Sequence, residues 1–273
     1  MYTALRIGFP SEPAVVLGAF QRSGDAPDAT LRRPSGGGVV RVGPGTLWMQ
    51  LALTLEDVPA DKLVNRHVRP LLKALTKVTS KPVSYFGRDW ISMAHHPVGF
   101  VGFAHDASKG EGLLEAVIAV DEPFVPPSAP LRPTFMGKAP KTLGVARDRV
   151  RDEVTAAYGL KSSGAPSAKV VIAEPPWAAT LEEAIGIVAA GRDANGRFRI
   201  GGEIMASSDA VARLEGMISS SFHSSGSMRD TVIDLDLDLD QAIDEAFTTG
   251  GATIFGVRSL ASIRDVIAAA RAV

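Results

Sequence analysis

The sequence predicts an α+β protein built in two parts, and three observations support this. Short apolar segments separated by glycine and proline turns fill the first 120 residues, with one amphipathic helix among them. The stretch 161–167 is rich in Ser, Gly and Pro, which is typical of a domain boundary. A hairpin turn at 193–196 and the helical patterns after it predict a small α+β unit. We therefore expect one domain at 1–160 and a second at 168–273.

In the first half, apolar and β-branched runs predict the first strands at 14–18, 39–42 and 47–55. The next element is a helix over 60–78, because its apolar residues recur at helical spacing. Pro70 falls inside that pattern and is expected to kink or restart the helix, since proline lacks the N–H that an interior position donates.

A hairpin is expected next, with strands at 90–94 and 100–104 around a loop at 95–99. A strand at 113–120 and a helix at 142–158 follow. Residues 123–140 contain six prolines, so this segment is expected to be an extended surface connector and not a helix or a central strand.

In the last third, the turn at 193–196 predicts a hairpin of the segments 184–190 and 197–205. Polar residues at 207–209 are typical of a helix cap, and helices are expected at 210–219, 240–247 and 260–270. Aspartates alternate with Ile and Leu over 233–240, which predicts an extended run with one solvated acidic face. A calcium site is the alternative for this run.

The bulk composition excludes several classes of protein. The formal net charge of −1 and the pI near 6.5 argue against a general nucleic-acid binder, which usually carries a basic excess. The absence of cysteine excludes disulfides, cysteine metal sites and a cysteine nucleophile. No run of apolar residues is long enough to cross a membrane, and the first residues lack the apolar core of a signal peptide. We therefore expect a cytoplasmic protein without membrane or nucleic-acid partners.

The segment 31–40 is the most informative stretch, because Arg32 and Arg33 precede Pro34, Ser35 and three glycines, Gly36, Gly37 and Gly38. Glycines let the backbone approach a ligand closely, and consecutive N–H groups in such a loop can form a concavity that binds anions. Arginines beside it suit a carboxylate or a phosphate. The alternative is a flexible surface turn next to a strand.

Several segments in order carry a resemblance to a known family: 13–21, the Arg-Arg-Pro-Ser-Gly-Gly-Gly loop at 32–38, the turn at 43–47 and Gly-Arg-Asp at 87–89. Together they resemble the lipoate–protein ligase branch of the biotin/lipoate ligase superfamily. The likeness covers about 13–150 well and 180–270 loosely.

The resemblance implies a mixed β-sheet backed by helices, with a smaller α+β accessory domain behind it. It also implies that lipoate, octanoate or biotin binds in a tunnel beside the glycine loop. Family members use ATP and magnesium to form an acyl-adenylate, and then pass the acyl group to a lysine of a carrier domain. Arg33 and the three glycines would hold the carboxyl or phosphate end, and Arg88 would lie near the nucleotide. The ligand-binding candidates are Arg32, Arg33, Ser35, Gly36, Gly37, Gly38, Arg88, Asp89 and Gly102.

This chain departs from the family pattern at the position of a lysine that faces the reacting carbonyl and phosphate. Gly102 matches the glycine of that motif, but Gly99 stands at the lysine position. A fixed cation there stabilises charge that grows in the transition state, and losing one such donor typically costs about 100- to 1,000-fold in rate. Asp89 replaces an asparagine and brings a negative charge toward the place for phosphate. Thr46 replaces another asparagine.

Two hypotheses follow from the resemblance and its departures. In the first, the chain binds a lipoyl- or octanoyl-type group but has lost or reduced adenylation, as a pseudo-ligase or a non-catalytic subunit with a partner protein. In the second, it is an active ATP-dependent lipoate or acyl–protein ligase with a relocated cation, Lys109, or with a donor from His95 or His96. An ATP-independent acyl transferase is a weaker third reading, since related transferases use a cysteine.

Two other groups of polar residues have simpler interpretations than a metal site or a hydrolase site. Zinc at His95, His96, His105 and Asp106 is disfavoured because adjacent strand residues point to opposite faces, so no metal site is assigned. His223 lies among serines, but without the Gly-x-Ser-x-Gly elbow of a hydrolase.

Overall fold

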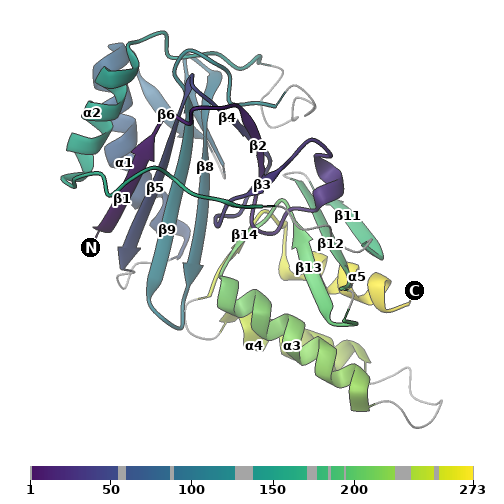
Figure 1. The fold of residues 1–273 in the computed structure, drawn as a ribbon. Coiled ribbons are helices and arrows are strands. Elements are labelled where there is room, and N and C mark those ends of the chain that lie inside the picture. The colour runs from purple at the N-terminus through teal and green to yellow at the C-terminus, as the bar shows by residue number, and fades with distance from the viewer. Residues whose placement is uncertain are drawn as a thin grey trace.

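The computed structural model describes residues 2–54, 60–86, 89–126, 138–170, 177–183, 186–193, 195–224, 235–248 and 252–272. Its largest element is a six-stranded antiparallel sheet in the order β1-β5-β9-β8-β7-β6 (Figure 1). The strands are β1 (Tyr2–Gly8), β5 (Thr46–Thr54), β6 (Val83–Phe86), β7 (Trp90–Met93), β8 (His96–Asp106) and β9 (Glu111–Ala119). Nine consecutive residue pairs join β5 and β9, so the centre of this sheet is fixed in register.

Alternation along β5 gives the large sheet two different faces. Leu47, Met49 and Leu51 belong to the main core, which the helices α1 (Ala60–Thr79) and α2 (Arg147–Tyr158) cover. Trp48 belongs to a separate apolar cluster on the opposite face, as side chains one residue apart in a strand point to opposite faces. The helices and the glycine loop therefore lie on opposite sides of this sheet.

A smaller four-stranded sheet packs on the face away from the helices. It runs β10-β3-β2-β4, with β2 (Ala14–Leu17), β3 (Leu31–Arg32), β4 (Val40–Val42) and β10 (Lys169–Val170). Its β2–β3 pair is parallel and its other pairs are antiparallel, so this small sheet is mixed, whereas the sheet that the helices cover is antiparallel throughout. A short 3₁₀ turn, η1 (Ser23–Asp25), lies between β2 and β3.

The C-terminal part has its own core and joins the rest through β14. It contains the antiparallel sheet β11 (Ala179–Glu183), β12 (Gly186–Arg192) and β13 (Phe198–Gly202), and the pair β14 (Met205–Ala206) and β15 (Ile254–Phe255). The helices α3 (Ser208–Ser224), α4 (Leu235–Thr248) and α5 (Leu260–Arg271) complete it. The α+β fold class is confirmed.

The predicted boundary segment is attached to the large sheet. Ser163 donates its backbone N–H to the Leu5 carbonyl at 2.7 Å. The Gln50 amide exchanges two hydrogen bonds with the backbone of Ser167, at 2.7 and 2.9 Å. Figure 1 shows this boundary segment, residues 161–167, crossing the strands on the face away from the helices. The division into two domains stays an expectation. The predicted linker is held against the large sheet by these hydrogen bonds.

The structure corrects three expectations. The hairpin of β7 and β8 turns through Ala94 and His95 alone, whose φ values of 50° and 63° suit the tight turns of hairpins, so the predicted 95–99 loop is wrong. Residues 235–240 begin α4, so the expected extended acidic run is wrong over that part, and its first residues lie outside the described ranges. Helix α1 continues through Pro70 with its apolar stripe buried on both sides of the proline, so the expected restart is wrong and the kink stays a prediction.

Other elements match or fall outside what is described. β1 was not predicted, and α2 begins at Arg147 and not at residue 142. Of the proline-rich connector, 127–137 lies outside the described residues, and the flanking parts carry no helix or strand. Within the described ranges, no helix combines the length and apolar character needed to span a membrane.

The C-terminal core contains a carboxyl group whose titration can be measured. Glu215 on α3 accepts the Ile200 N–H at 2.8 Å and pairs with Arg199 at 3.1 Å. Burial raises its pKa, and the Ile200 and Arg199 contacts oppose part of that shift.

We expect the Glu215→Gln variant to lose a pH dependence that the wild type shows. A carboxyl whose pKa is raised in the folded state binds more protons folded than unfolded, so stability falls as pH rises from its unfolded pKa through the raised value. Glutamine keeps the acceptor for the Ile200 N–H but does not titrate. Urea unfolding between pH 4 and 7 should show wild-type stability declining relative to the variant. Parallel profiles would contradict the assignment.

Candidate functional site

The glycine loop is buried and packs against backbone on two sides. The Gly36 N–H donates to the Phe103 carbonyl at 3.2 Å, and the Gly37 N–H donates to the Ile204 carbonyl at 2.8 Å. A Cβ at Gly36 would lie 2.3 Å from the Ile204 carbonyl oxygen, so only glycine fits. Gly37 has a φ of 93°, which other residues rarely adopt. The glycines are therefore required for close contact with β8 and with the segment before β14.

Arg33 is the largest fully buried side chain, and the loop is built around it. Its guanidinium donates to the Gly36 and Gly38 carbonyls at 3.0 and 2.7 Å, and to the Val16 carbonyl at 3.2 Å. Its Nε donates to the Ser35 hydroxyl at 3.1 Å, and its Cζ lies 4.4 Å from the centre of the Phe100 ring. This arginine therefore holds the loop in shape with donors that the sequence analysis had assigned to a ligand.

Arg32 has a similar use at the edge of the small sheet. One of its terminal nitrogens lies within 3.2 Å of the carbonyl oxygens of Gly18, Ala19 and Gln21. The side chain is half-buried. It fixes the turn after β2 beside the loop, so both arginines are placed by backbone carbonyl groups.

Beneath the loop lies a row of polar residues that the sequence analysis did not select. Gln50, Glu115 and Gly102 are register partners across β5, β9 and β8. The fully buried Glu115 carboxylate accepts from the Trp48 indole at 2.7 Å, the Gln50 amide at 2.8 Å and the Ser35 N–H at 3.2 Å. A polar side chain within an otherwise apolar strand, at 50 and again at 115, was the available signal.

The other residues that the sequence singled out lie at different places in the fold. Gly102 lies directly under the loop, where a Cβ would come 2.3 Å from the Ser35 hydroxyl oxygen. Asp89 is buried just before β7, and its carbonyl accepts the Val101 N–H at 2.8 Å. Thr46 hydrogen-bonds Gly43 and closes the turn before β5. Arg88 lies outside the described residues, so its predicted position near a nucleotide stays a prediction.

Lys109 lies in the exposed turn between β8 and β9. Its ammonium pairs with Asp106 at 2.5 Å, and hydrogen bonds from Lys109 and Ser108 lower the pKa of Asp106 to about 2. Asp209 of α3 accepts the N–H groups of Ala107 and Ser108 at 3.1 and 3.2 Å, which attaches this turn to the C-terminal part. The catalytic role expected of Lys109 stays a prediction.

The histidines have separate surroundings. His105 is buried and hydrogen-bonds the Ser207 hydroxyl at 2.5 Å, which joins β8 to the start of α3. His96 contacts the Ala139 carbonyl at 2.9 Å. Within the described part of the chain, no group of three histidine, aspartate or glutamate residues could hold a metal ion.

The described residues do not fit nucleotide phosphates at the glycine loop. The N–H groups of Gly36 and Gly37 donate to protein carbonyls, and the Arg33 guanidinium donates to four protein groups. Trp48, Trp90 and Phe100 form a buried apolar cluster between the two sheets.

Comparisons with solved structures identify the fold. LipL1 of P. falciparum in complex with lipoate is similar over 96% of this chain and 86% of that one, with a TM-score of 0.58 and 11% identity. Lipoate-protein ligase A bound with ATP has a TM-score of 0.47 and 14% identity, covering 59% and 76% of the two chains.

A bi-partite lipoate protein ligase from Thermoplasma acidophilum, studied with its E2 lipoyl domain, has a TM-score of 0.46 and 16% identity over 59% of this chain and 74% of that one. No family model and no curated protein matches the sequence. The chain therefore has the lipoate–protein ligase fold, and the resemblance first drawn from the motifs is confirmed at the level of the fold.

Proposed function

We propose, with the lipoate–protein ligase fold as the premise, that this protein binds a lipoyl- or octanoyl-type acyl group and has lost or reduced the adenylation chemistry. It would act as a pseudo-ligase or as a non-catalytic subunit that presents the acyl group to a lipoyl-carrier domain or a partner protein. One observation carries the proposal. The position matched to the family lysine is Gly99, and a side chain at this position would point away from the glycine loop.

Gly99 pairs with Ile91 of β7 and with Ile118 of β9, beside a register shift in the β7–β8 pair. A Cβ on Gly99 would come 2.6 Å from the Ile118 Cδ1, and Ile118 belongs to the core that α1 and α2 cover. Gly102, three residues later, faces Ser35 on the other side. A side chain at 99 therefore points to the helices, and a lysine there could not reach a carboxylate beside the loop.

Lys109 is badly placed to replace that cation. From Gly102 to the end of β8 at Asp106, the strand advances by about 13 Å, at about 3.3 Å per residue. Lys109 lies beyond that end, in the turn, and its ammonium is paired with Asp106. We assign it no part in the acyl site, and the active-ligase reading becomes an outcome of the test.

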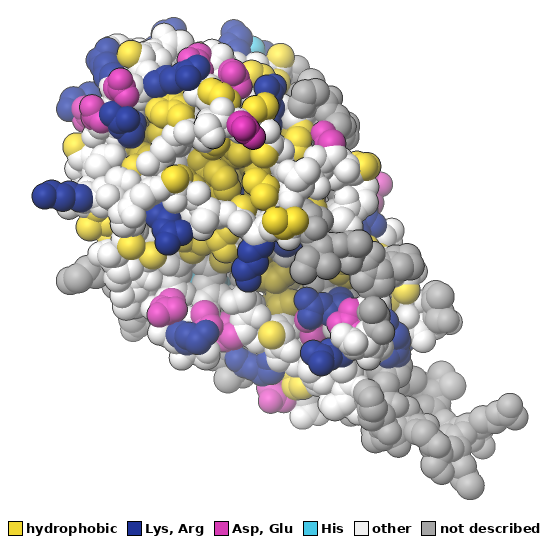
Figure 2. All heavy atoms as spheres, in the orientation of Figure 1, with side chains coloured by type: hydrophobic (Ala, Val, Ile, Leu, Met, Phe, Trp, Pro, Cys, Tyr) yellow, Lys and Arg dark blue, Asp and Glu magenta, His cyan; other side chains and the backbone are white. Residues whose placement is uncertain are grey.

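The acyl group would bind on the face of the large sheet away from the helices. Figure 2 shows hydrophobic side chains gathered on that face over the large sheet, with lysines, arginines and some acidic side chains around them. Apolar surface bordered by cations suits a fatty acyl chain that ends in a carboxylate. The cysteine-free composition agrees with action in the cytoplasm, where we place it.

The test measures binding and chemistry separately. Octanoate and lipoate should quench or shift the fluorescence of the tryptophans, because Trp48 and Trp90 lie between the sheets. With ATP, magnesium and a lipoyl-carrier domain, we expect no pyrophosphate release and no mass increase of the carrier. Lys109→Ala and the exposed control Lys141→Ala should both leave binding unchanged.

Two outcomes would overturn the proposal. Acylated carrier that disappears in Lys109→Ala but persists in Lys141→Ala would establish the active ligase. Absence of any response to octanoate, lipoate or biotin in a folded sample would exclude acyl binding.

A further inference from the structure

A row of basic side chains runs along the exposed face of α1, on the side of the large sheet away from the glycine loop. Its members are Lys62, Arg66, Arg69, Lys73 and Lys77, all exposed. Residues three or four apart in a helix lie on one face, so these five form one continuous stripe. At 1.5 Å per residue the stripe is about 22 Å long. We call it the α1 basic stripe.

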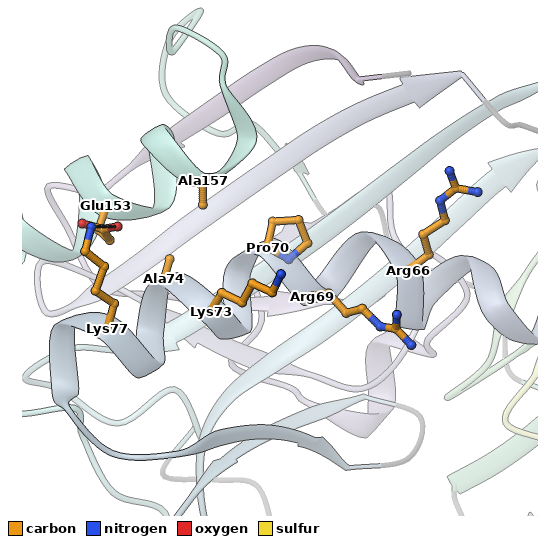
Figure 3. A pocket seen from close by; sticks show the side chains of 8 residues that line it. All are labelled: Arg66, Arg69, Pro70, Lys73, Ala74, Lys77, Glu153 and Ala157. Atoms are coloured by element: carbon orange, nitrogen blue, oxygen red, sulfur yellow. Dashed lines mark hydrogen bonds and ion pairs between the residues drawn. The ribbon is translucent and has the colours of Figure 1, made fainter.

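A groove lies beside this stripe, between α1 and α2. Its volume is about 370 Å³, and Arg66, Arg69, Lys73 and Lys77 line it from α1; in Figure 3 Lys77 turns toward Glu153, whereas the end of Arg69 turns away from α2. Pro70 and Ala74 of α1 and Ala157 of α2 supply small apolar surface, and Glu153 of α2 is the acidic group on its wall. The groove therefore combines a line of cations with room for an apolar side chain.

Within the described part of the chain, three of the five cations of the stripe make no ion pair, while Arg66 and Lys77 have partners. Lys77 pairs with Glu153 at 2.6 Å, but Lys62, Arg69 and Lys73 make no ion pair with the side chains of the described ranges. Like charges three or four residues apart destabilise a helix, and cations near a helix N-terminus oppose its dipole. The stripe thus works against the stability of α1, although the chain as a whole is close to neutral.

We propose that the α1 basic stripe is a docking surface for an acidic protein segment, a helix or extended peptide carrying about four carboxylates along one side with an apolar residue among them. Carboxylates pair with the cations of α1, and the apolar residue packs on Pro70, Ala74 and Ala157. Opposite charges on the two partners give this contact its specificity and raise its rate of formation.

The groove favours a peptide over other anionic partners. The Lys77–Glu153 ion pair interrupts the row of cations, and a peptide can present a neutral group at that point whereas a continuous phosphate backbone cannot. A membrane-bound helix needs its apolar face, but the apolar face of α1 is buried in the main core. The surface is also independent of the proposed acyl site, since the sheet separates the two.

The test uses a fluorescein-labelled peptide of 16 residues, with glutamates at helical three- and four-residue spacing and one central leucine. Fluorescence anisotropy with the full chain should show binding that weakens strongly between 50 and 200 mM salt. The double variant R69E/K73E should weaken binding at least about tenfold, because like charges then face each other. The matched variant K81E/K161E changes the same charge at two exposed lysines off the stripe and should bind as the wild type does.

Circular dichroism of both double variants establishes that they fold. As a control for charge, a peptide with glutamine in place of glutamate should not bind. Equal losses in the two double variants, or no binding by the wild type, would overturn the proposal. Tighter binding of a 12-nucleotide single-stranded DNA or of phosphatidylserine vesicles, with the same dependence on Arg69 and Lys73, would also overturn it in favour of a phosphate-bearing partner.

Discussion

Replacing Arg33 with methionine is expected to lower the free energy of unfolding by about 3–5 kcal/mol, a large fraction of the stability of an ordinary domain. Methionine fills most of the space but donates no hydrogen bond. The carbonyl groups of Val16, Gly36 and Gly38 would each lose a donor while buried. The loss should appear in urea unfolding without any ligand, since these contacts lie within the protein.

Arg32 provides the comparison for that experiment. It also donates to three backbone carbonyls, but its side chain is half-buried, so water can replace it at those oxygens. Arg32→Met should therefore cost only about 1 kcal/mol. If Arg33→Met unfolded at the wild-type denaturant concentration and lost only octanoate binding, Arg33 would be a ligand group, as the sequence analysis expected, and not a structural one.

The two arginines show what the sequence could predict about the site. The Arg-Arg-Pro-Ser-Gly-Gly-Gly pattern predicted a loop whose backbone is approached closely, because glycine has the same steric meaning in any context, but it assigned that approach to a ligand. It did not predict what approaches. Ile204, about 170 positions later in the chain, supplies the carbonyl that meets the loop, and no local pattern reports such a distant contact.

The large sheet was predictable for a different reason. Strands β5 and β9 are long and mostly apolar, so composition alone locates them. β1 was missed because Arg6 and two other exposed positions interrupt its apolar pattern, and its stability comes from pairing with β5. The first residues of α4 were misassigned because alternating aspartate and leucine fits a strand period, while burial of Leu239 and Ile243 against the C-terminal core favours a helix.

Restoring a lysine at Gly99 is expected to damage the fold without creating a ligase. The new Cβ would meet Ile118 and the Val117 carbonyl, at 2.6 and 3.0 Å, and the ammonium would lie in the core that α1 covers. Overpacking costs about 1–3 kcal/mol, and burying an unpaired charge costs several more, so we expect a total loss of about 3–6 kcal/mol. Urea unfolding measures this loss, and the carrier-acylation assay with ATP should stay negative.

Gly99→Ala separates the two contributions, because it adds the Cβ without the charge. Its cost should stay within the overpacking range of about 1–3 kcal/mol, and the difference from Gly99→Lys then reports burial of the ammonium.

The direction of the side chain at position 99 also decides how the loss of ligase chemistry is understood. If Gly99→Lys folded with wild-type stability and acylated a carrier, position 99 would face the acyl site, and a single substitution would separate this protein from an active ligase. A destabilised and inactive variant means instead that position 99, beside the register shift of the β7–β8 hairpin, points into the core and cannot serve the acyl site. Activity could then return only through a change in the hairpin itself.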